Sequence, residues 1–181
     1  MFSWGWNIWG QLGHGDIENR NKPKIIKFFK DKEIVHVYCL DDSSFVLLKS
    51  GSVYGFGLNT RSELGIGNTT NQAIPQELVY FKNIPISKIY CGGYHVFAIT
   101  KSNKVYCWGE NTSYQLGLGD NKNRLTPEEH KYFRGKQIIQ CSLGWKHSII
   151  LTETPKPKSF IIRLKRKDNI DIKFKLNTSY F

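Results

Sequence analysis

Short apolar runs separated by polar turns dominate the hydrophobic pattern of the chain. The apolar run Phe45–Leu48 is followed by the turn Lys49–Ser52 and by the run Val53–Gly57, which together predict a β-hairpin. No stretch repeats its apolar residues every 3.6 positions, as an amphipathic helix would. The pattern therefore predicts an all-β protein.

The same reasoning predicts further short strands. They are expected at residues 2–5, 24–27, 34–39, 75–80, 86–91 and 148–152. Four such strands fall within each stretch of 52 residues, and four short antiparallel strands make one blade of a β-propeller.

A repeat with a period of 52 residues supports this interpretation. The stretch Ser3–Asp16 recurs at Gly55–Asn68 and at Cys107–Asp120 without a gap. A second pattern, Gly92–His95, recurs as Gly144–His147. The repeated positions are Trp4, Phe56 and Trp108; Gly5, Gly57 and Gly109; Asn7, Asn59 and Asn111; Leu12, Leu64 and Leu116; Gly13, Gly65 and Gly117; Gly15, Gly67 and Gly119; Gly92 and Gly144; and His95 and His147.

Structural roles are predicted for all of these residues. The glycines are expected at turns that need a positive φ or a close backbone approach. The aromatic residues at positions 4, 56 and 108 are expected to pack between neighbouring blades, and the asparagines to hydrogen-bond turn backbone. The recurring histidines are expected to make a repeated hydrogen bond. A phosphate-binding loop is not expected, because neither a Lys-Ser/Thr pair nor a helix follows the glycines.

The pattern Trp-Gly-x-Asn-x-x-x-Gln-Leu-Gly-x-Gly, followed by Gly-x-x-His-Ser, resembles the regulator of chromosome condensation repeat. The resemblance extends from Met1 to about Thr152. It implies a β-propeller that binds other proteins and that, in the family, typically has seven blades. Some members sense light through a cluster of tryptophans. That role is not expected here, because the turns equivalent to the one with Trp145 carry Asp42 and Tyr94 and no tryptophan.

The number of blades is too small for a closed ring. The repeats amount to two strands, two full blades and two strands, whereas closed propellers have about 4–8 blades. We therefore expect an open, partial propeller of about three blades. We also expect it to be a fragment of a larger repeat protein, completed by further repeats or by self-association.

The repeat register is lost after Thr152, which divides the chain into three parts. Residues 1–152 hold the repeats, 153–159 are a Pro/Lys linker, and 160–181 are a basic, β-rich tail expected to form a hairpin. The segment Asp171–Leu176 weakly resembles the start of a BTB/POZ domain, which would imply a ubiquitin-ligase adaptor. Otherwise Lys165, Arg166 and Lys167 form a patch for an acidic partner or for nuclear import.

The formal net charge of +11 favours acidic partners and permits nucleic acid without specificity. The four cysteines show no zinc-binding spacing, and no apolar run is long enough to span a membrane. An intracellular protein of the cytoplasm or nucleus is expected, with its thiols acting as small core residues.

The expected function is that of a non-enzymatic protein-interaction scaffold or adaptor, without metal or cofactor. Asp41-Asp42 and Glu128-Glu129 are adjacent pairs whose side chains point to opposite faces of a strand, so neither pair predicts an acid/base site. The alternative, from the family resemblance, is a nucleotide exchange factor for a small GTPase that associates with chromatin.

Overall fold

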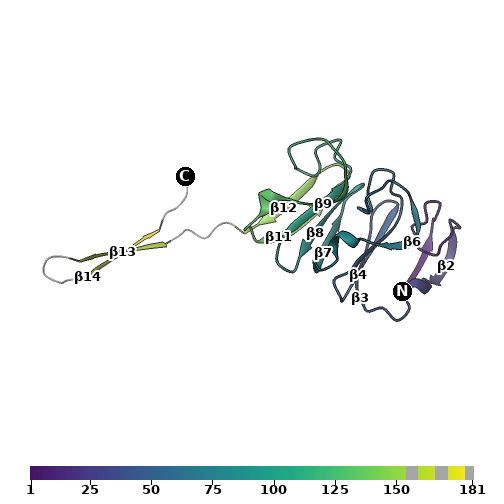
Figure 1. Cartoon of the computed structure of the whole chain (residues 1–181), viewed down its shortest axis with the longest axis horizontal. Helices are drawn as coiled ribbons and strands as arrows, with labels where there is room; N and C mark the ends of the chain where they lie inside the picture. Colours follow the sequence, from purple (N-terminus) through teal and green to yellow (C-terminus); the bar gives the residue numbers. More distant parts are fainter. Residues whose placement is uncertain (154–158, 166–170, 178–181) are drawn as a thin grey trace.

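The computed structural model describes residues 1–153, 159–165 and 171–177, and its regular structure there is β-strand with three short 3-10 helices (Figure 1). The strands are β1 (Phe2–Gly5), β2 (Arg20–Ile25), β3 (Ile34–Cys39), β4 (Ser43–Leu48), β5 (Val53–Gly57), β6 (Gln72–Glu77), β7 (Ile86–Cys91), β8 (His95–Thr100), β9 (Val105–Gly109), β10 (Arg124–Glu129), β11 (Ile138–Leu143), β12 (Ser148–Thr152), β13 (Ser159–Lys165) and β14 (Asp171–Asn177).

Two complete blades form the centre of the repeat region. One is a four-stranded sheet in the order β3-β4-β5-β6, and the other has the order β7-β8-β9-β10. All neighbouring strands are antiparallel and consecutive in sequence, so each sheet is a simple meander. This is the blade architecture that the hydrophobic pattern predicts.

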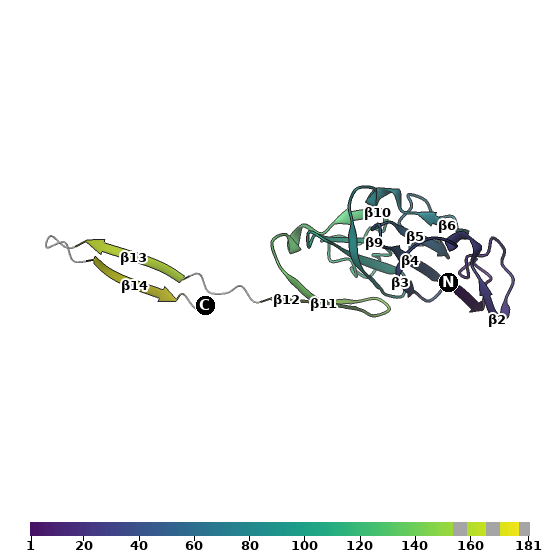
Figure 2. The ribbon, with the colours of Figure 1, turned by 90° about the horizontal axis from the view of Figure 1, so that it is seen from below.

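A half-blade lies at each end of this pair. β1 pairs with β2 at one end, and β11 pairs with β12 at the other, as Figures 1 and 2 show. By the 52-residue register, β1 and β2 correspond to the third and fourth strands of a blade, and β11 and β12 to the first and second. The prediction of an open, partial propeller of about three blades is confirmed.

The hydrophobic core lies between the blades. Phe45 and Leu47 of β4 pack in one cluster with Ile89, Val96 and Trp108 of the second blade. Each sheet therefore buries one face against the next sheet, and removal of that face from water provides the main stabilisation.

The outer strands differ from the predicted ones. β2, β6 and β10 each begin three residues before a proline (Pro23, Pro75 and Pro127), whereas the predicted strands 24–27 and 75–80 begin after or at one. Proline lacks an N–H but is tolerated in an edge strand, where that position need not donate to a neighbour. The 3-10 helices Lys27–Phe29, Val79–Phe81 and Lys131–Phe133 follow these strands and were not predicted.

The hairpin-like tail is confirmed at the level of the backbone. β13 pairs antiparallel with β14, from Ser159 opposite Asn177 to Lys165 opposite Asp171. The rest of the predicted basic patch, Arg166 and Lys167, and most of the predicted linker lie outside the described residues.

We expect Leu64→Ala to lower the free energy of unfolding by about 2–5 kcal/mol, because Leu64 is completely buried in the inter-blade cluster. Urea denaturation measures the change. Val79→Ala is the control, since Val79 is 71% exposed, and it should change stability by less than about 0.5 kcal/mol. Equal effects of the two substitutions would contradict the assignment of the core.

Candidate interaction surface

An asparagine closes the long loop that follows the third strand of each blade. In the first repeat, Oδ1 of Asn7 accepts from the N–H of Leu12 at 2.8 Å, and its Nδ2 donates to the carbonyl of Asp16 at 3.0 Å. The same two bonds recur from Asn59 to Leu64 and Asn68, and from Asn111 to Leu116 and Asp120. All three asparagines are fully buried, so their side chains replace the backbone partners that the loop lacks.

A second asparagine in each repeat, which the sequence analysis does not single out, also fixes the loop. The side chain of Asn19 accepts from the backbone N–H of Asn7 at 2.8 Å, and the bond recurs from Asn71 to Asn59 and from Asn123 to Asn111. The signal was present, because positions 19, 71 and 123 follow the same 52-residue period. Two asparagines per repeat thus fix the loop from both ends.

An aromatic ring from each complete blade lies on a glycine of the repeat before it. A Cβ atom built on Gly13 would lie 2.8 Å from the ring of Phe56, and one built on Gly65 would lie 2.7 Å from the ring of Trp108. Trp108 also donates from Nε1 to the carbonyl of Glu63 at 2.8 Å. Only glycine leaves room for these rings at this distance.

Trp4 is an exception to the predicted packing between blades. It occupies the same repeat position as Phe56 and Trp108, which are buried, but it is 58% exposed. The reason is geometric: its ring would lie on the repeat before its own, and the described residues contain no such repeat.

The two glycines of the motif allow a matched test of the ring contact. Gly65 and Gly67 both have positive φ, at 67° and 85°, so alanine at either position should cost about 1–2 kcal/mol of backbone strain. A Cβ atom at Gly67 meets nothing closer than Thr126 at 3.7 Å, whereas at Gly65 it meets the Trp108 ring. Gly65→Ala should therefore lower the free energy of unfolding by at least about 1 kcal/mol more than Gly67→Ala in urea titrations.

The two recurring histidines do not have the same surroundings. Nε2 of His95 lies 2.8 Å from Oγ of Ser148, and burial, with a smaller contribution from the charge of His147, lowers the pKa of His95 to about 4. His147 is exposed, and no hydrogen bond from its ring is found within residues 1–153. Both rings pack close to a glycine, Gly92 and Gly144 respectively. The predicted hydrogen bond is therefore seen for His95 and not for His147.

The buried His95 predicts a pH dependence of stability. Its pKa is lowered from 6.5 to about 4, so between these values the unfolded chain binds the proton and the folded chain does not. The stabilisation is complete above pH 6.5 and is lost as the pH falls to 4, by up to about 3 kcal/mol. His95→Gln should flatten this part of the stability curve, measured by urea denaturation at pH 7 and pH 4.5. An unchanged slope would contradict the assignment.

The meander topology sorts the strand connections to two opposite ends of the blades. One end, here called the motif end, carries the asparagine loops 6–19, 58–71 and 110–123 and the turns 40–42, 92–94 and 144–147. The other, here called the basic end, carries the turns 49–52 and 101–104 and the connections 26–33, 78–85 and 130–137. Every charged loop residue of the repeats therefore belongs to one end or the other.

Charge is strongly segregated between the two ends. The connections of the basic end contain ten Lys/Arg and two Asp/Glu, and those of the motif end contain three Lys/Arg and seven Asp/Glu. The basic residues are Lys27, Lys30, Lys32, Lys49, Lys82, Lys101, Lys104, Lys131, Arg134 and Lys136. A formal charge of +8 at one end thus faces −4 at the other.

Few of the basic side chains are neutralised by neighbours. Lys49 pairs with Glu33 at 3.0 Å, and Arg134 pairs with Glu129 at 2.7 Å, while the Lys136 ammonium lies 3.4 Å from the centre of the Tyr132 ring. No ion pair is found for the other lysines of the basic end among the described residues. Their charges project into solvent and attract anions over about a Debye length.

The 3-10 helices add aromatic side chains to the basic end. Phe28, Tyr80 and Tyr132 occupy the same repeat position and are all exposed, while the next residue of each helix packs inward. A row of exposed rings beside the lysines provides apolar contacts in addition to charge. The basic end is therefore an amphipathic surface that a partner can cover.

No metal site is found in the described part of the chain. No group of three or more His, Cys, Asp or Glu side chains could hold a metal ion there. All four cysteines are free, but only Cys107 and Cys141 are buried, and burial raises the pKa of these thiols to about 12 and about 11. Cys39 is exposed, so it is not the core residue expected. No helix among these residues could cross a bilayer.

Comparison with known proteins agrees with this architecture. The four-stranded meander blades define a β-propeller repeat protein. A family model of the regulator of chromosome condensation (RCC1) repeat matches residues 1–47, 50–99 and 102–151, and a second model of the repeat matches residues 86–115. The chain therefore belongs to the RCC1-repeat family.

Several relatives share this region. The chain is 33% identical over 149 residues to the ultraviolet-B receptor UVR8 of Arabidopsis thaliana, a match that covers 82% of this chain and 34% of the receptor. It is 30% identical over 156 residues to the human E3 ubiquitin-protein ligase HERC2, covering 85% of this chain and 3% of the ligase. The chain thus spans about a third or less of these curated relatives.

Solved structures show the same fold. Prp20p from Saccharomyces cerevisiae aligns with a TM-score of 0.74 at 22% identity, covering 85% of this chain and 40% of that one. Human WBSCR16 aligns with a TM-score of 0.73 at 23% identity, covering 83% and 39%. At this identity the likeness supports the fold alone.

Proposed function

We propose that the chain is a protein-binding module whose basic end binds an acidic protein surface, without catalysis of its own. The segregation of charge between the two ends is the observation that carries this proposal. A uniform excess of lysine would give weak attraction from every side, whereas +8 at one end gives a partner a preferred orientation.

A protein partner is favoured over a nucleic acid by the form of the surface. The basic end presents the exposed rings of Phe28, Tyr80 and Tyr132 together with its lysines, as does a protein interface with aromatic anchors and a charged periphery. Only one arginine, Arg134, lies at this end, and it is paired with Glu129. Arginine is the side chain most suited to bidentate contacts with phosphates and bases.

Finer roles follow from the relatives and remain proposals. The human relative HERC2 is an E3 ubiquitin-protein ligase, and Prp20p of Saccharomyces cerevisiae binds Gsp1p and histones. A ubiquitin-ligase adaptor, or a regulator of nucleotide exchange on a small GTPase, would use the same kind of protein contact. Stimulated release of GDP from such a GTPase by the purified chain would favour the second role over simple binding.

Charge reversal provides the test of the basic end. Lys101→Glu together with Lys131→Glu should weaken binding to fluorescent poly-L-glutamate about tenfold or more at low salt, measured by anisotropy. Lys88→Glu with Lys122→Glu, which changes the net charge equally but away from the basic end, is the matched control. Equal loss in both pairs, or tighter binding to a DNA duplex than to poly-L-glutamate, would overturn the proposal.

A further inference from the structure

The two half-blades of one chain are complementary parts of a single blade. We propose that two copies of the chain associate head to tail, with β1–β2 of one copy completing the blade begun by β11–β12 of the other. The evidence is the contact of an aromatic ring with a glycine of the preceding repeat. The chain makes this contact twice within itself, and at a third, equivalent glycine the aromatic ring is missing. This inference does not rest on the proposed function, although Tyr132 of the basic end also lines the hollow described below.

The occupied contact is best seen at Trp108. Its ring lies on Gly65, its Nε1 donates to the carbonyl of Glu63, and the rings of Phe45 and Phe81 lie 6.0 and 5.7 Å away between centres. These four partners come from the preceding repeat and define a socket for one aromatic side chain.

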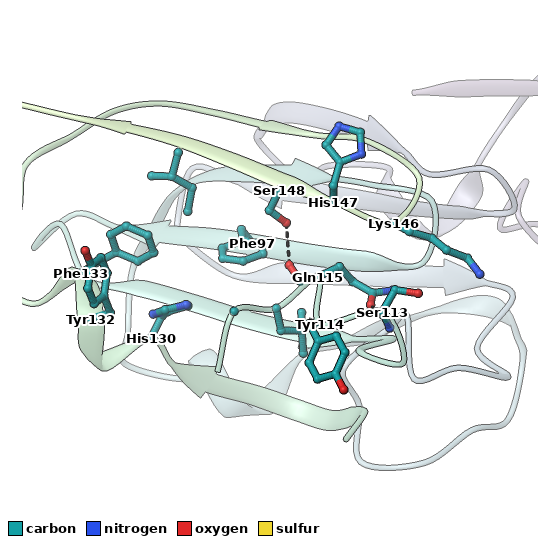
Figure 3. A pocket seen from close by; sticks show the side chains of 13 residues that line it. Phe97, Ser113, Tyr114, Gln115, His130, Tyr132, Phe133, Lys146, His147 and Ser148 are labelled. Carbon is teal, nitrogen blue, oxygen red and sulfur yellow. Dashed lines mark hydrogen bonds between the residues drawn. The ribbon is translucent and has the colours of Figure 1, made fainter. Parts of the chain in front are cut away.

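The equivalent socket in the next repeat is open. Adding 52 to these positions gives Gln115, Gly117, Phe97 and Phe133, and all four line one open hollow of about 440 Å³ beside β12 (Figure 3). In this hollow Oγ of Ser148 donates to the carbonyl of Gln115 at 2.7 Å, as Ser44 donates to Gln11 at the first contact. The wall of the socket is therefore already in its assembled form.

Trp4 is the side chain in register to fill this socket. It stands at the repeat position of Phe56 and Trp108, and it is 58% exposed. The next residue, Gly5, has φ of 107°, close to 109° for Gly57 and 96° for Gly109. β1 thus already has the backbone conformation found next to the aromatic rings that occupy the other two sockets.

Phe160 has the same spacing in the sequence, but its neighbour makes it a poorer candidate. Position 161 is isoleucine, where the blades have Gly57 and Gly109. Both glycines have a positive φ. In addition, a Cβ atom on Gly57 would collide with the carbonyl of Asp42, and one on Gly109 with the carbonyl of Tyr94. A β-branched residue at position 161 disfavours the backbone conformation that would place the preceding aromatic ring in the socket.

The second half of the interface is also complementary. Ile149 and Leu151 of β12 are 64% and 52% exposed, although their counterparts Phe45 and Leu47 are buried in the inter-blade cluster. A hollow at the other end of the chain is lined by Ile26, Val37, Val46 and Phe56, the counterparts of the residues that surround Phe45 and Leu47. In the assembly, each copy would fill the hollow of the other.

The strand pairing of the new seam follows from the register within the blades. In the complete blade Ser44 lies opposite Phe56 and Phe45 lies opposite Gly55. The same register places Ser148 of one copy opposite Trp4 of the other, and Ile149 opposite Ser3. Two such seams join six blades, and because this number lies within the range of about 4–8 that closes a propeller, we expect a closed ring of two copies.

Light scattering on the purified 181-residue chain tests the proposal. The expected mass is twice the 21.0 kDa of the chain, and Trp4→Ala should weaken the dimer about 30-fold or more. Phe160→Ala should leave the dimer unchanged, which separates the two aromatic candidates. Val79→Lys is the control for a surface change, because the other repeats carry Lys27 and Lys131 at that position.

Disulfide trapping checks the register directly. Under mild oxidation, the double variant Ser3→Cys, Ile149→Cys should form a covalent dimer, because residues opposite one another in antiparallel strands meet the distance requirement of a disulfide. The chain without added cysteines and the pair Ser3→Cys, Val79→Cys should not. A monomer, a ladder of higher oligomers, or a dimer that Phe160→Ala rather than Trp4→Ala disrupts would overturn the proposal.

Discussion

The seat of an aromatic ring on a glycine of the preceding repeat is the contact on which the repeat architecture depends. Phe56 on Gly13 and Trp108 on Gly65 set the distance between successive sheets, because a side chain in place of the glycine would fill the position of the ring. The glycine belongs to the same loop as Asn7 or Asn59, whose buried hydrogen bonds hold that loop in shape. Loop shape and sheet packing are therefore one constraint, which explains why the motif combines glycine, asparagine and an aromatic residue.

Much of this architecture was predictable because the chain repeats it three times. Periodicity located the strands of the blades to within a few residues, and the count of strands predicted an open propeller. The predicted outer strands begin at or after their prolines, whereas Pro75 lies inside an edge strand, where the missing N–H is tolerated. The role of Asn19 does not follow from its repetition alone, because its partner is a backbone N–H that only the folded loop brings close.

Other features depend on position in the fold and not on residue type. Trp4 and Trp108 have the same motif, yet one is exposed and the other buried, because a preceding sheet exists only for Trp108 among the described residues. His95 and His147 differ for a related reason: Ser148 of the next half-blade reaches His95. A periodic sequence predicts equivalent environments, and an open propeller breaks that equivalence at its two ends.

The net charge of +11 conceals an uneven distribution of charge between the two ends of the blades. Within the repeats the connections contribute +8 at the basic end and −4 at the motif end, and only the alternation of connections in a meander reveals this separation. Head-to-tail assembly would preserve the alternation, since each blade of a propeller ring has the same orientation. The basic ends of both copies would then lie on one face of the ring.

A partner large enough to contact both basic ends would bind with higher affinity without a new kind of interaction, because the second binding step is intramolecular. Closure of the ring rests on Trp4 and its hollow, and recognition of an acidic partner rests on the lysines of the basic end; only Tyr132 belongs to both surfaces. Closure would nevertheless strengthen binding of such a partner, because it places two basic ends side by side.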